Sequence, residues 1–278
     1  MRICELATLG PIPRDPGILP RMINDVDLDV PDTLVAPLLG GAAALLANGV
    51  EVVATRLVVD DETLGACVAL LSADERERAG RFAFERDRRR FIVGRARLRQ
   101  LLAERLDARP ESIALVYGAR GKPAIVRSSR EPDVRFNMSH CDDVAVYGIS
   151  SGREIGVDVE AIRPLREADD IAARFFSPRE NVAYRALAPS ERSEGFFNCW
   201  TRKEAFIKAL GEGLYFPLDR FDVSLAPGEP AKILHVAGTD GDECGWTMES
   251  FSPAPGFVAA VVVEKSIAST AGARTISS

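Results

Sequence analysis

The chain has 278 residues, of which 46% are hydrophobic and 27% are charged, with a formal net charge of −6. This composition is typical of a globular protein and excludes a disordered chain, and the length allows one large domain or two modest ones. The acidic balance argues against a general nucleic-acid binder. The five cysteines are scattered without a CxxC pair, which argues against a disulfide framework or a structural zinc site and favours a reducing cytosol.

The amino-terminal stretch contains acids, Pro and Gly where a signal peptide has an apolar run. The most apolar segment, Val35 to Ala47, contains Pro37 and two glycines and is shorter than the roughly 20 residues that span a bilayer. We therefore expect a soluble, cytoplasmic protein without a membrane partner. Residues 1–48 are rich in Pro, Gly and Asp, and predict an N-terminal extension with room for one short helix.

The first structured part of the chain combines strand and helix patterns. Residues 50–60 alternate well enough to predict a first strand. Ser72, with Glu75 three residues later, is a capping-box pattern that predicts the start of a helix. A long helix is expected over 85–106, because its apolar residues recur at helical intervals. Residues 112–125, SIALVYGARGKPAI, predict a strand, a glycine-punctuated loop and a proline stop.

The next segments predict two strands, three helices and three further strands. The stretches 144–150 and 155–160 are expected to be adjacent strands, and antiparallel pairing is one arrangement for them. Helices are expected at 169–176, at 178–187 with Ser177 as N-cap, and from Trp200 to a stop at Gly211. Strands are expected at 221–225, 245–251 and 256–264, and 266–278 reads as a loose tail.

The order of these elements predicts an α+β protein made of two similar halves. We place the N-terminal half at 49–150 and the C-terminal half at 151–265. Both contain helices and strands in a similar order, although no sequence repeat is visible. A pseudo-duplicated α+β architecture is therefore the expected fold class.

An excess of arginine marks the region from Arg76 to Arg99, which holds ten arginines against Glu77, Glu85 and Asp87. Such an excess inside an acidic protein indicates an anionic ligand or partner. A solvated helix face that carries arginines explains the same pattern. The sequence alone leaves both readings open.

Two motifs place carboxylates where they can act together. In GVDVE, Asp158 and Glu160 share one face of a strand, because the side-chain period is two. Paired carboxylates repel unless a cation lies between them, and Mg²⁺ prefers oxygen ligands. In WTRKEAFIKALGEGL, Glu204 and Lys208 share one helix face. Three carboxylates from these motifs can converge on one ion. The alternatives are a solvent-facing strand and a surface ion pair.

Two further segments carry polar groups suited to phosphate. In FNMSHCDD, the side chains of Asn137, Ser139 and His140 suit contacts to phosphate or sugar, whereas ordinary turn chemistry is the alternative. A Ser–His dyad from adjacent residues is disfavoured, because neighbours on an extended chain face apart. In ARGKP, Arg120 and Lys122 flank a glycine and can pair with phosphate, although the Walker spacing is absent.

Taken together and in order, these segments resemble a 4'-phosphopantetheinyl transferase of the broad-specificity kind that activates peptide and polyketide synthetases. The match runs from about residue 71 to residue 225 and rests on LSADERERAGRFAFERD, GKP, FNMSH, IGVDVE, RFFSPRE and WTRKEAFIKALGEGL. The C-terminal strands match more loosely. Residues 1–48 have no counterpart that we can place, and Cys141 stands where a small polar residue is more usual.

The resemblance implies a reaction and its partners. Such an enzyme moves the 4'-phosphopantetheine arm of coenzyme A onto a serine of an apo acyl or peptidyl carrier protein and releases adenosine 3',5'-bisphosphate. The cofactor implied is Mg²⁺, with Mn²⁺ as the alternative. The fold implied is a monomeric pseudo-dimer with coenzyme A in the cleft between its halves. A coenzyme A pyrophosphate hydrolase and an inactive scaffold that binds coenzyme A or carrier proteins are the competing functions.

The resemblance also implies roles for individual residues. The metal ligands match Asp158, Glu160 and Glu204. Glu204 takes the serine proton, with Glu180 or a metal-bound water as the alternatives because a metal-bound carboxylate is a weak base, and Lys208 contacts the transferring phosphate. Trp200 reads as a packing anchor for its helix. Coenzyme A is held by Arg78, Arg120, Lys122, Asn137, Ser139, His140 and Asp158, with Arg90 added by charge alone.

Overall fold

The computed structural model describes residues 49–118, 121–126, 132–211, 216–238 and 245–265. The predicted extension over 1–48, the predicted tail over 266–278 and Arg120 lie outside the described residues. The helices are α3 (Asp61–Ala69), α4 (Ala73–Gly80), α5 (Glu85–Leu106), α6 (Ala168–Phe175), α7 (Pro178–Ala186) and α8 (Arg192–Leu210). The strands are β1 (Val50–Arg56), β2 (Leu115–Tyr117), β3 (Pro123–Ile125), β4 (Val134–Cys141), β5 (Val144–Ser151), β6 (Ile155–Ala161), β7 (Phe221–Val223), β8 (Ile233–Val236), β9 (Trp246–Phe251) and β10 (Phe257–Glu264).

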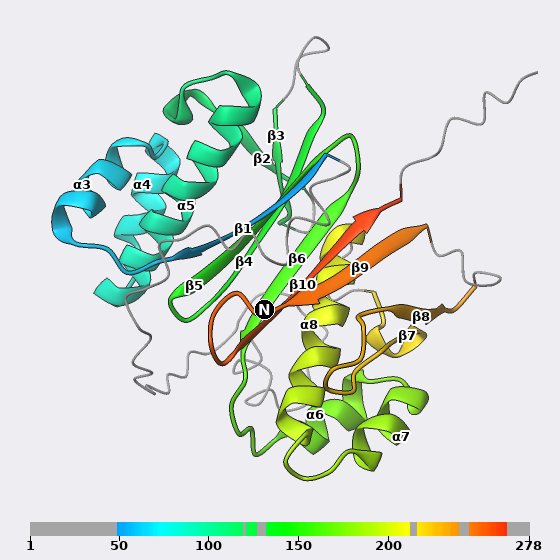
Figure 1. Ribbon diagram of the computed structural model, residues 1–278. Coiled ribbons are helices and arrows are strands. Elements are labelled where there is room, and N and C mark those ends of the chain that lie inside the picture. Colours follow the sequence, from blue (N-terminus) through cyan, green and yellow to red (C-terminus); the bar gives the residue numbers. More distant parts are fainter. Residues whose placement is uncertain (1–48, 119–120, 127–131, 212–215, 239–244, 266–278) are drawn as a thin grey trace, which may run out of the picture.

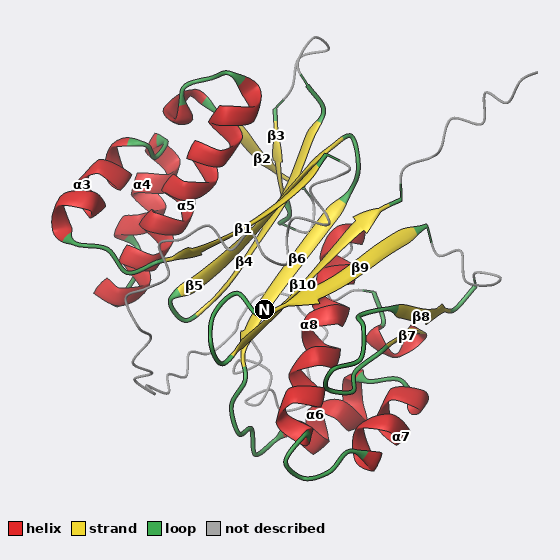
Figure 2. Cartoon of the chain, in the orientation of Figure 1, coloured by secondary structure: helices red, strands yellow, loops and turns green. Residues whose placement is uncertain are grey.

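Two three-stranded antiparallel sheets form the centre of the molecule (Figure 2). One has the strand order β1-β5-β4 and the other has the order β6-β10-β9. Helices α3, α4 and α5 lie on the side of the first sheet, and α6, α7 and α8 lie on the side of the second (Figure 1). The small pairs β2-β3 and β7-β8 complete the described strands. Each half thus contributes one sheet and one group of helices, as the predicted pseudo-duplicated α+β class requires.

Alternating side chains divide the core into three layers. On β6, Val157 and Val159 join the apolar cluster between the two sheets. The residues that alternate with these valines along β6, namely Gly156, Asp158 and Glu160, face the opposite way, toward α8. A second cluster lies between α5 and the first sheet, and a third lies between α8 and the second sheet. The predicted metal carboxylates therefore lie on the helix-facing side of the second sheet.

Several predicted elements are confirmed. Helix α5 has the predicted bounds, and the Glu75 carboxylate accepts a hydrogen bond from the Ser72 N–H at 3.1 Å, as in a capping box. Ser177 caps α7, and its hydroxyl accepts from the Glu180 N–H. Helix α8 stops at Gly211, whose φ of +73° is the left-handed conformation that glycine adopts readily. Helix α8 begins at Arg192, eight residues before the predicted start.

Three predictions need correction. Strand β1 ends at Arg56, and Asp60 caps the helix α3 that periodicity did not reveal. Strands β5 and β6 were expected to be adjacent, but the chain turns at Gly152 and passes from one sheet to the other. The segment from Asn137 to His140 lies within β4 rather than at a strand start, and the turn follows at Asp142. None of the described helices is long and apolar enough to cross a membrane.

Replacement of Gly156 tests the contact between β6 and α8. A Cβ atom at Gly156 would lie 2.1 Å from the Ala205 carbonyl oxygen and 2.3 Å from the Ala209 nitrogen. Because both neighbours are helix backbone, we expect Gly156→Ala to lower the free energy of unfolding by about 3 kcal/mol or more in urea denaturation. Gly65→Ala in α3, where a Cβ meets nothing within 4 Å, should raise it by roughly 0.5–1 kcal/mol. Equal midpoints for wild type and Gly156→Ala would contradict the contact.

Candidate active site at the junction of the two sheets

A cluster of polar side chains joins β4, β6 and α8. Oδ1 of Asp158 accepts hydrogen bonds from Nζ of Lys208 at 2.5 Å and from Oγ of Ser139 at 2.8 Å. Nζ of Lys208 also lies 3.1 Å from Oγ of Ser139. Ser139 belongs to the N-terminal half, whereas the other two belong to the C-terminal half. This triad therefore spans the two halves of the molecule.

Two more carboxylates share the electrostatic environment of this triad. Glu160 is 6% exposed and Glu204 is 3% exposed. Burial, aided by the charge of Asp158, raises the pKa of Glu160 to about 8, although Lys208 opposes the shift. Burial also raises the pKa of Glu204. Burial disfavours the charged form of Lys208, but Asp158 and Glu204 outweigh it and raise its pKa. The Lys208 ammonium therefore neutralises part of the negative charge that these carboxylates carry.

The oxygen atoms of the cluster are suited to a hard cation. Oδ2 of Asp158 and Oε1 of Glu204 are buried and have no hydrogen-bond partner among the described residues. Such oxygens are the donors that Mg²⁺ and Mn²⁺ prefer. Within the described ranges, however, no three His, Cys, Asp or Glu side chains converge on a common point. These carboxylate oxygens have the ligand chemistry that a divalent cation requires. In the structure, the Lys208 ammonium provides the positive charge next to Asp158.

Two predicted coenzyme A residues link the halves at the same junction. Oδ1 of Asn137 accepts a hydrogen bond from the Val157 N–H at 2.9 Å, so this side chain connects β4 to β6. Nζ of Lys122 lies 2.9 Å from Oε2 of Glu154 and 3.2 Å from the carbonyl oxygen of Ala209. A third acceptor, the carbonyl oxygen of Ile155, lies at 3.3 Å and occupies the remaining proton of the ammonium. Lys122 therefore braces α8 against β6.

The other predicted coenzyme A residues lie in different surroundings. His140 is half-buried on β4, directly after Ser139. Arg78 lies on α4, and its guanidinium carbon stands 5.3 Å from the centre of the Phe91 ring. Arg90 forms an ion pair with Asp143 at 2.7 Å. The described contacts do not bring Arg78 or Arg90 to the triad.

Glu180, the predicted alternative base, lies in a buried network in which both of its carboxylate oxygens have partners. Its Oε1 accepts from the Val223 N–H, and its Oε2 accepts from the Ser177 N–H, both at 2.7 Å. Oε2 also pairs with Nζ of Lys203 at 2.8 Å, and both side chains are almost fully buried. Glu180 therefore fastens α7, β7 and α8 to one another. The sequence contained both residues, but no local pattern pairs them.

Helix α8 excludes the surface ion pair that the spacing of Glu204 and Lys208 allowed. Glu204 is buried against the second sheet, and Trp200 is fully buried, as the prediction of a packing anchor requires. The Trp200 ring packs edge-on against Phe175 and parallel to Phe196.

A cavity of about 210 Å³ lies away from the polar cluster. Its lining includes Arg163, Tyr184 and Phe196 and none of the cluster residues.

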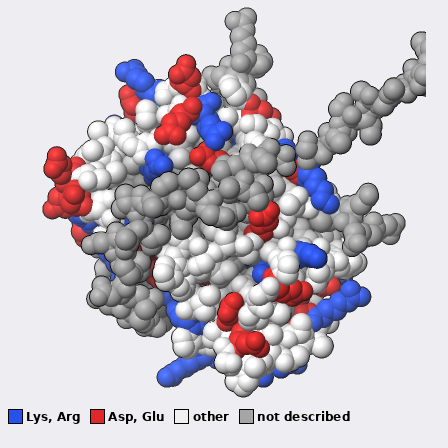
Figure 3. Space-filling model, viewed as in Figure 1, with Lys and Arg blue, Asp and Glu red and all other residues white. Residues whose placement is uncertain are grey.

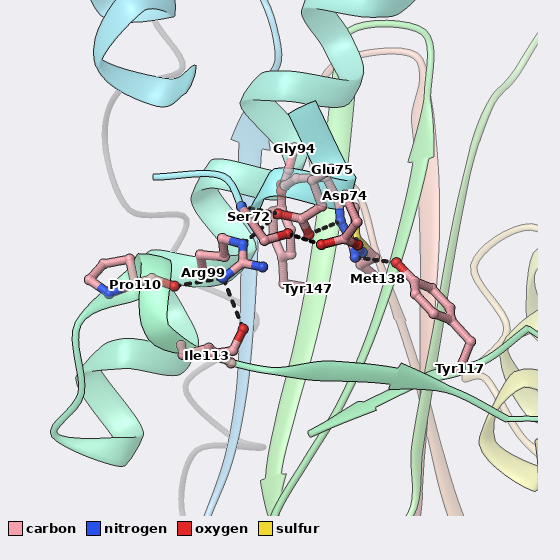
Figure 4. Close-up of polar contacts among 11 residues, drawn as sticks. Ser72, Asp74, Glu75, Gly94, Arg99, Pro110, Ile113, Tyr117, Met138 and Tyr147 are labelled. Carbon is pink, nitrogen blue, oxygen red and sulfur yellow. Dashed lines mark hydrogen bonds and ion pairs between the residues drawn. The ribbon is translucent and has the colours of Figure 1, made fainter. Parts of the chain in front are cut away.

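The arginine excess divides into buried and exposed groups. Nε of Arg99 binds Oε2 of Glu75 at 2.5 Å (Figure 4). Nε of Arg95 binds Oε1 of the same carboxylate at 2.8 Å, and all three side chains are buried. Arg81, Arg88 and Arg89 pair with carboxylates near the surface. On the face shown in Figure 3, basic and acidic side chains are interspersed. Neither sequence reading foresaw that arginines would be buried around Glu75.

Two protein-family models and several known proteins match this chain. Residues 154–262 match the model of the 4'-phosphopantetheinyl transferase superfamily, and residues 60–151 match that of the N-terminal part of 4'-phosphopantetheinyl transferases. The 4'-phosphopantetheinyl transferase HetI of Nostoc sp. is 36% identical over 219 residues, which is 79% of this chain and 89% of that protein. A 4'-phosphopantetheinyl transferase of Bacillus subtilis is 37% identical over 158 residues, covering 57% of this chain and 68% of that protein.

Together these matches show that the chain belongs to the 4'-phosphopantetheinyl transferase superfamily. It is an enzyme of that class, whose members transfer a phosphopantetheine group to carrier proteins and take coenzyme A as substrate. Among solved structures, a holo-[acyl-carrier-protein] synthase of Thermotoga maritima aligns with 40% of this chain and 62% of its own. Its TM-score of 0.32 and sequence identity of 22% are too low to support a closer comparison.

Loss of the Glu180 charge should destabilise the protein through Lys203. Glu180→Gln leaves a buried ammonium without its carboxylate, so we expect the free energy of unfolding to fall by about 3 kcal/mol in urea denaturation. Glu104→Gln changes the same group on the exposed side of α5 and should stay within about 0.5 kcal/mol of wild type. If both variants unfold at the wild-type midpoint, the Glu180–Lys203 pair does not hold α7 and α8 together.

The raised pKa of Glu160 gives stability a dependence on pH. In the unfolded chain this carboxyl ionises near its ordinary value, so between about pH 5 and pH 8 the folded chain holds the proton more tightly. Stability is therefore greatest at the acid end of this window and falls as pH rises, by at most about 1.4 kcal/mol per pH unit. In chelator-containing buffer, Glu160→Gln should lose less stability across the window than wild type. Identical slopes would count against the buried, protonated Glu160.

Proposed function

We propose that this enzyme transfers the 4'-phosphopantetheine arm of coenzyme A to a serine of apo acyl and peptidyl carrier proteins, with broad specificity and with Mg²⁺. The observation that carries the proposal is the cluster of Ser139, Asp158 and Lys208, together with the buried oxygens Oδ2 of Asp158 and Oε1 of Glu204, which have no hydrogen-bond partner among the described residues. In this reaction the Oγ atom of the carrier protein's serine forms a bond to the β-phosphorus of coenzyme A. The bond to the adenosine 3',5'-bisphosphate oxygen breaks, and the serine proton leaves.

The divalent cation is assigned to the carboxylates of Asp158, Glu160 and Glu204, with Mn²⁺ as the alternative ion. When bound, it supplies positive charge that stabilises the charge on the pyrophosphate oxygens. Ser139 supports the assignment of Asp158, because its hydroxyl donates to Oδ1 and leaves Oδ2 free. The ammonium of Lys208 provides a second positive charge at the junction, suited to the transferring phosphate.

Glu204 is the group best suited to accept the serine proton. Burial raises the pKa of Glu204, so its metal-free carboxylate is a stronger base than an ordinary glutamate, and a bound cation opposes this shift. One of its oxygens is unpartnered among the described residues, whereas both oxygens of Glu180 are occupied. We therefore assign proton transfer to Glu204 and a structural role to Glu180.

The nucleotide of coenzyme A is assigned to the junction between the halves. Asn137 lies at this junction, where its amide oxygen accepts a hydrogen bond from the Val157 N–H. Ser139 and His140 follow on the same strand, and Lys122 closes the other end of the junction. Arg78 and Arg120 complete the proposed set. We further propose a cytoplasmic monomer that acts without nucleic acid or membrane.

Mass spectrometry of the acceptor tests this function. The protein is incubated with coenzyme A, Mg²⁺ and a panel of apo acyl and peptidyl carrier proteins, and each carrier is weighed. We expect carriers to gain the mass of one 4'-phosphopantetheine, and a chelator to prevent the gain until Mg²⁺ is restored. Cleavage of coenzyme A without a gain on any carrier would favour the hydrolase. Binding without either reaction would favour the scaffold.

A substitution at Glu204 tests its proposed role as base. Glu204→Gln keeps the shape of the side chain and removes its basicity, so we expect the turnover number to fall about 10²- to 10⁴-fold with an unchanged circular dichroism spectrum. Glu194→Gln alters an exposed glutamate on the same helix and should transfer at the wild-type rate. Wild-type turnover by Glu204→Gln would remove this residue from the reaction.

A further inference from the structure

The β2–β3 hairpin contacts both halves of the molecule. At the end of β2, the Tyr117 hydroxyl accepts a hydrogen bond from Nη2 of Arg95 on α5 at 2.6 Å. Just before β3, Nζ of Lys122 donates to the carbonyl oxygens of Ile155 and Ala209, at 3.3 and 3.2 Å. The hairpin is therefore fastened to α5 at one end and to β6 and α8 at the other.

The second attachment places Lys122 beside the proposed active site. Ala209 directly follows Lys208 on α8, and Ile155 precedes Asp158 by three residues on β6. A movement of the hairpin therefore displaces Lys122, which contacts the carbonyl oxygens of Ile155 and Ala209 next to the cluster. On the N-terminal side, Leu115 and Ile125 pack the hairpin against the apolar core, and the Tyr117 hydroxyl adds a polar attachment at the end of β2 that faces Lys122.

Arg95 is a rigid support for Tyr117. Its Nε binds Oε1 of Glu75 at 2.8 Å, and the side chain is 8% exposed. The other oxygen of Glu75 is held by Arg99, whose Nη1 also binds the carbonyl oxygens of Pro110 and Ile113 (Figure 4). A guanidinium so enclosed has little freedom to follow its partner, so it holds Tyr117 in place.

Tyr117 has little packing of its own to hold it. The residue is 45% exposed, and β2 and β3 pair over only three residues each. Its ring lies with the Arg95 guanidinium carbon 5.9 Å from the ring centre, so Arg95 provides both a hydrogen bond and a cation–π contact. A hydrogen bond to a charged group is stronger than a neutral one, and this one is made by an otherwise exposed side chain.

We propose that Arg95 and Tyr117 are positioning residues for coenzyme A, which fix the end of β2 so that Lys122 holds β6 and α8 in the arrangement of a preformed nucleotide site. The inference rests on the proposed function for its ligand. Neither residue touches the cluster of Ser139, Asp158 and Lys208. Their loss should therefore weaken the binding of coenzyme A and leave the chemical step at saturation unchanged.

Tyr117→Phe is the sharpest test, because it removes one hydroxyl from a half-exposed side chain and creates no cavity. We expect the dissociation constant of coenzyme A, measured by calorimetry without a carrier, to rise about tenfold, as loss of one charge-assisted hydrogen bond allows. The KM for coenzyme A should rise similarly, while kcat, the KM for the carrier and the melting temperature stay at wild-type values. Val116→Ala, at an exposed neighbour on β2, should change none of these quantities.

A double-mutant cycle separates positioning from general stability. Arg95→Lys keeps the charge but loses the planar fork that reaches both Glu75 and Tyr117. If Arg95 acts through Tyr117, the two substitutions together should weaken coenzyme A binding no more than Arg95→Lys alone. Should Arg95→Lys fail to fold, Tyr117→Phe decides the question by itself.

The Tyr117→Phe measurements can fail independently of the proposed function. An unchanged dissociation constant for coenzyme A in Tyr117→Phe overturns the inference. A loss of melting temperature accompanied by a fall in kcat overturns it as well, because the hydroxyl is then merely structural. If wild type binds coenzyme A but modifies no carrier, the proposed function fails, and the binding measurement still decides the role of Tyr117.

Discussion

The close approach of α8 to β6 at Gly156 is the constraint on which the rest of the structure depends. No side chain separates the helix backbone from the strand at this point, since a Cβ would overlap Ala205 and Ala209. The strand alternation then turns Asp158 and Glu160 toward the helix, and the helical repeat turns Glu204 and Lys208 toward the strand. A glycine thus sets the distance between the strand and the helix that carry these four side chains.

Burial of these charges is stabilised by partners from distant parts of the chain. Lys208 neutralises Asp158, Lys203 neutralises Glu180, and Arg95 and Arg99 share Glu75. Buried ion pairs contribute little net stability but are strongly destabilising when one partner is lost, so they specify geometry. In the C-terminal half, the carboxylates of Asp158, Glu160 and Glu204 outnumber the single ammonium of Lys208. Around Glu75 the surplus is positive, and Nη2 of Arg95 donates a hydrogen bond to the Tyr117 hydroxyl at the end of β2.

Local patterns predicted most of the elements but not their partners. The capping box at Ser72, the helix over 85–106 and the Gly211 stop were predicted because their signals lie within a few residues of one another. Strand β5 was expected beside β6, yet pairing is decided by which apolar faces bury together across the whole chain. Helix α3 was missed because its apolar pattern is weak, and the pairing of Glu180 with Lys203 was not foreseen because the two residues are 23 positions apart.

The sequence by itself determined the family, the two-half α+β plan and the faces on which the acidic residues stand, because motif order and side-chain periods are local properties. Only the tertiary structure decided that the faces of β6 and α8 meet, that Ser139 reaches across from the other half, and that Glu180 turns inward to Lys203. Only it decided that two arginines of a basic segment are buried around Glu75. The physical reason is that desolvation and pairing of charges depend on neighbours brought together by the core, and no short stretch of sequence contains those neighbours.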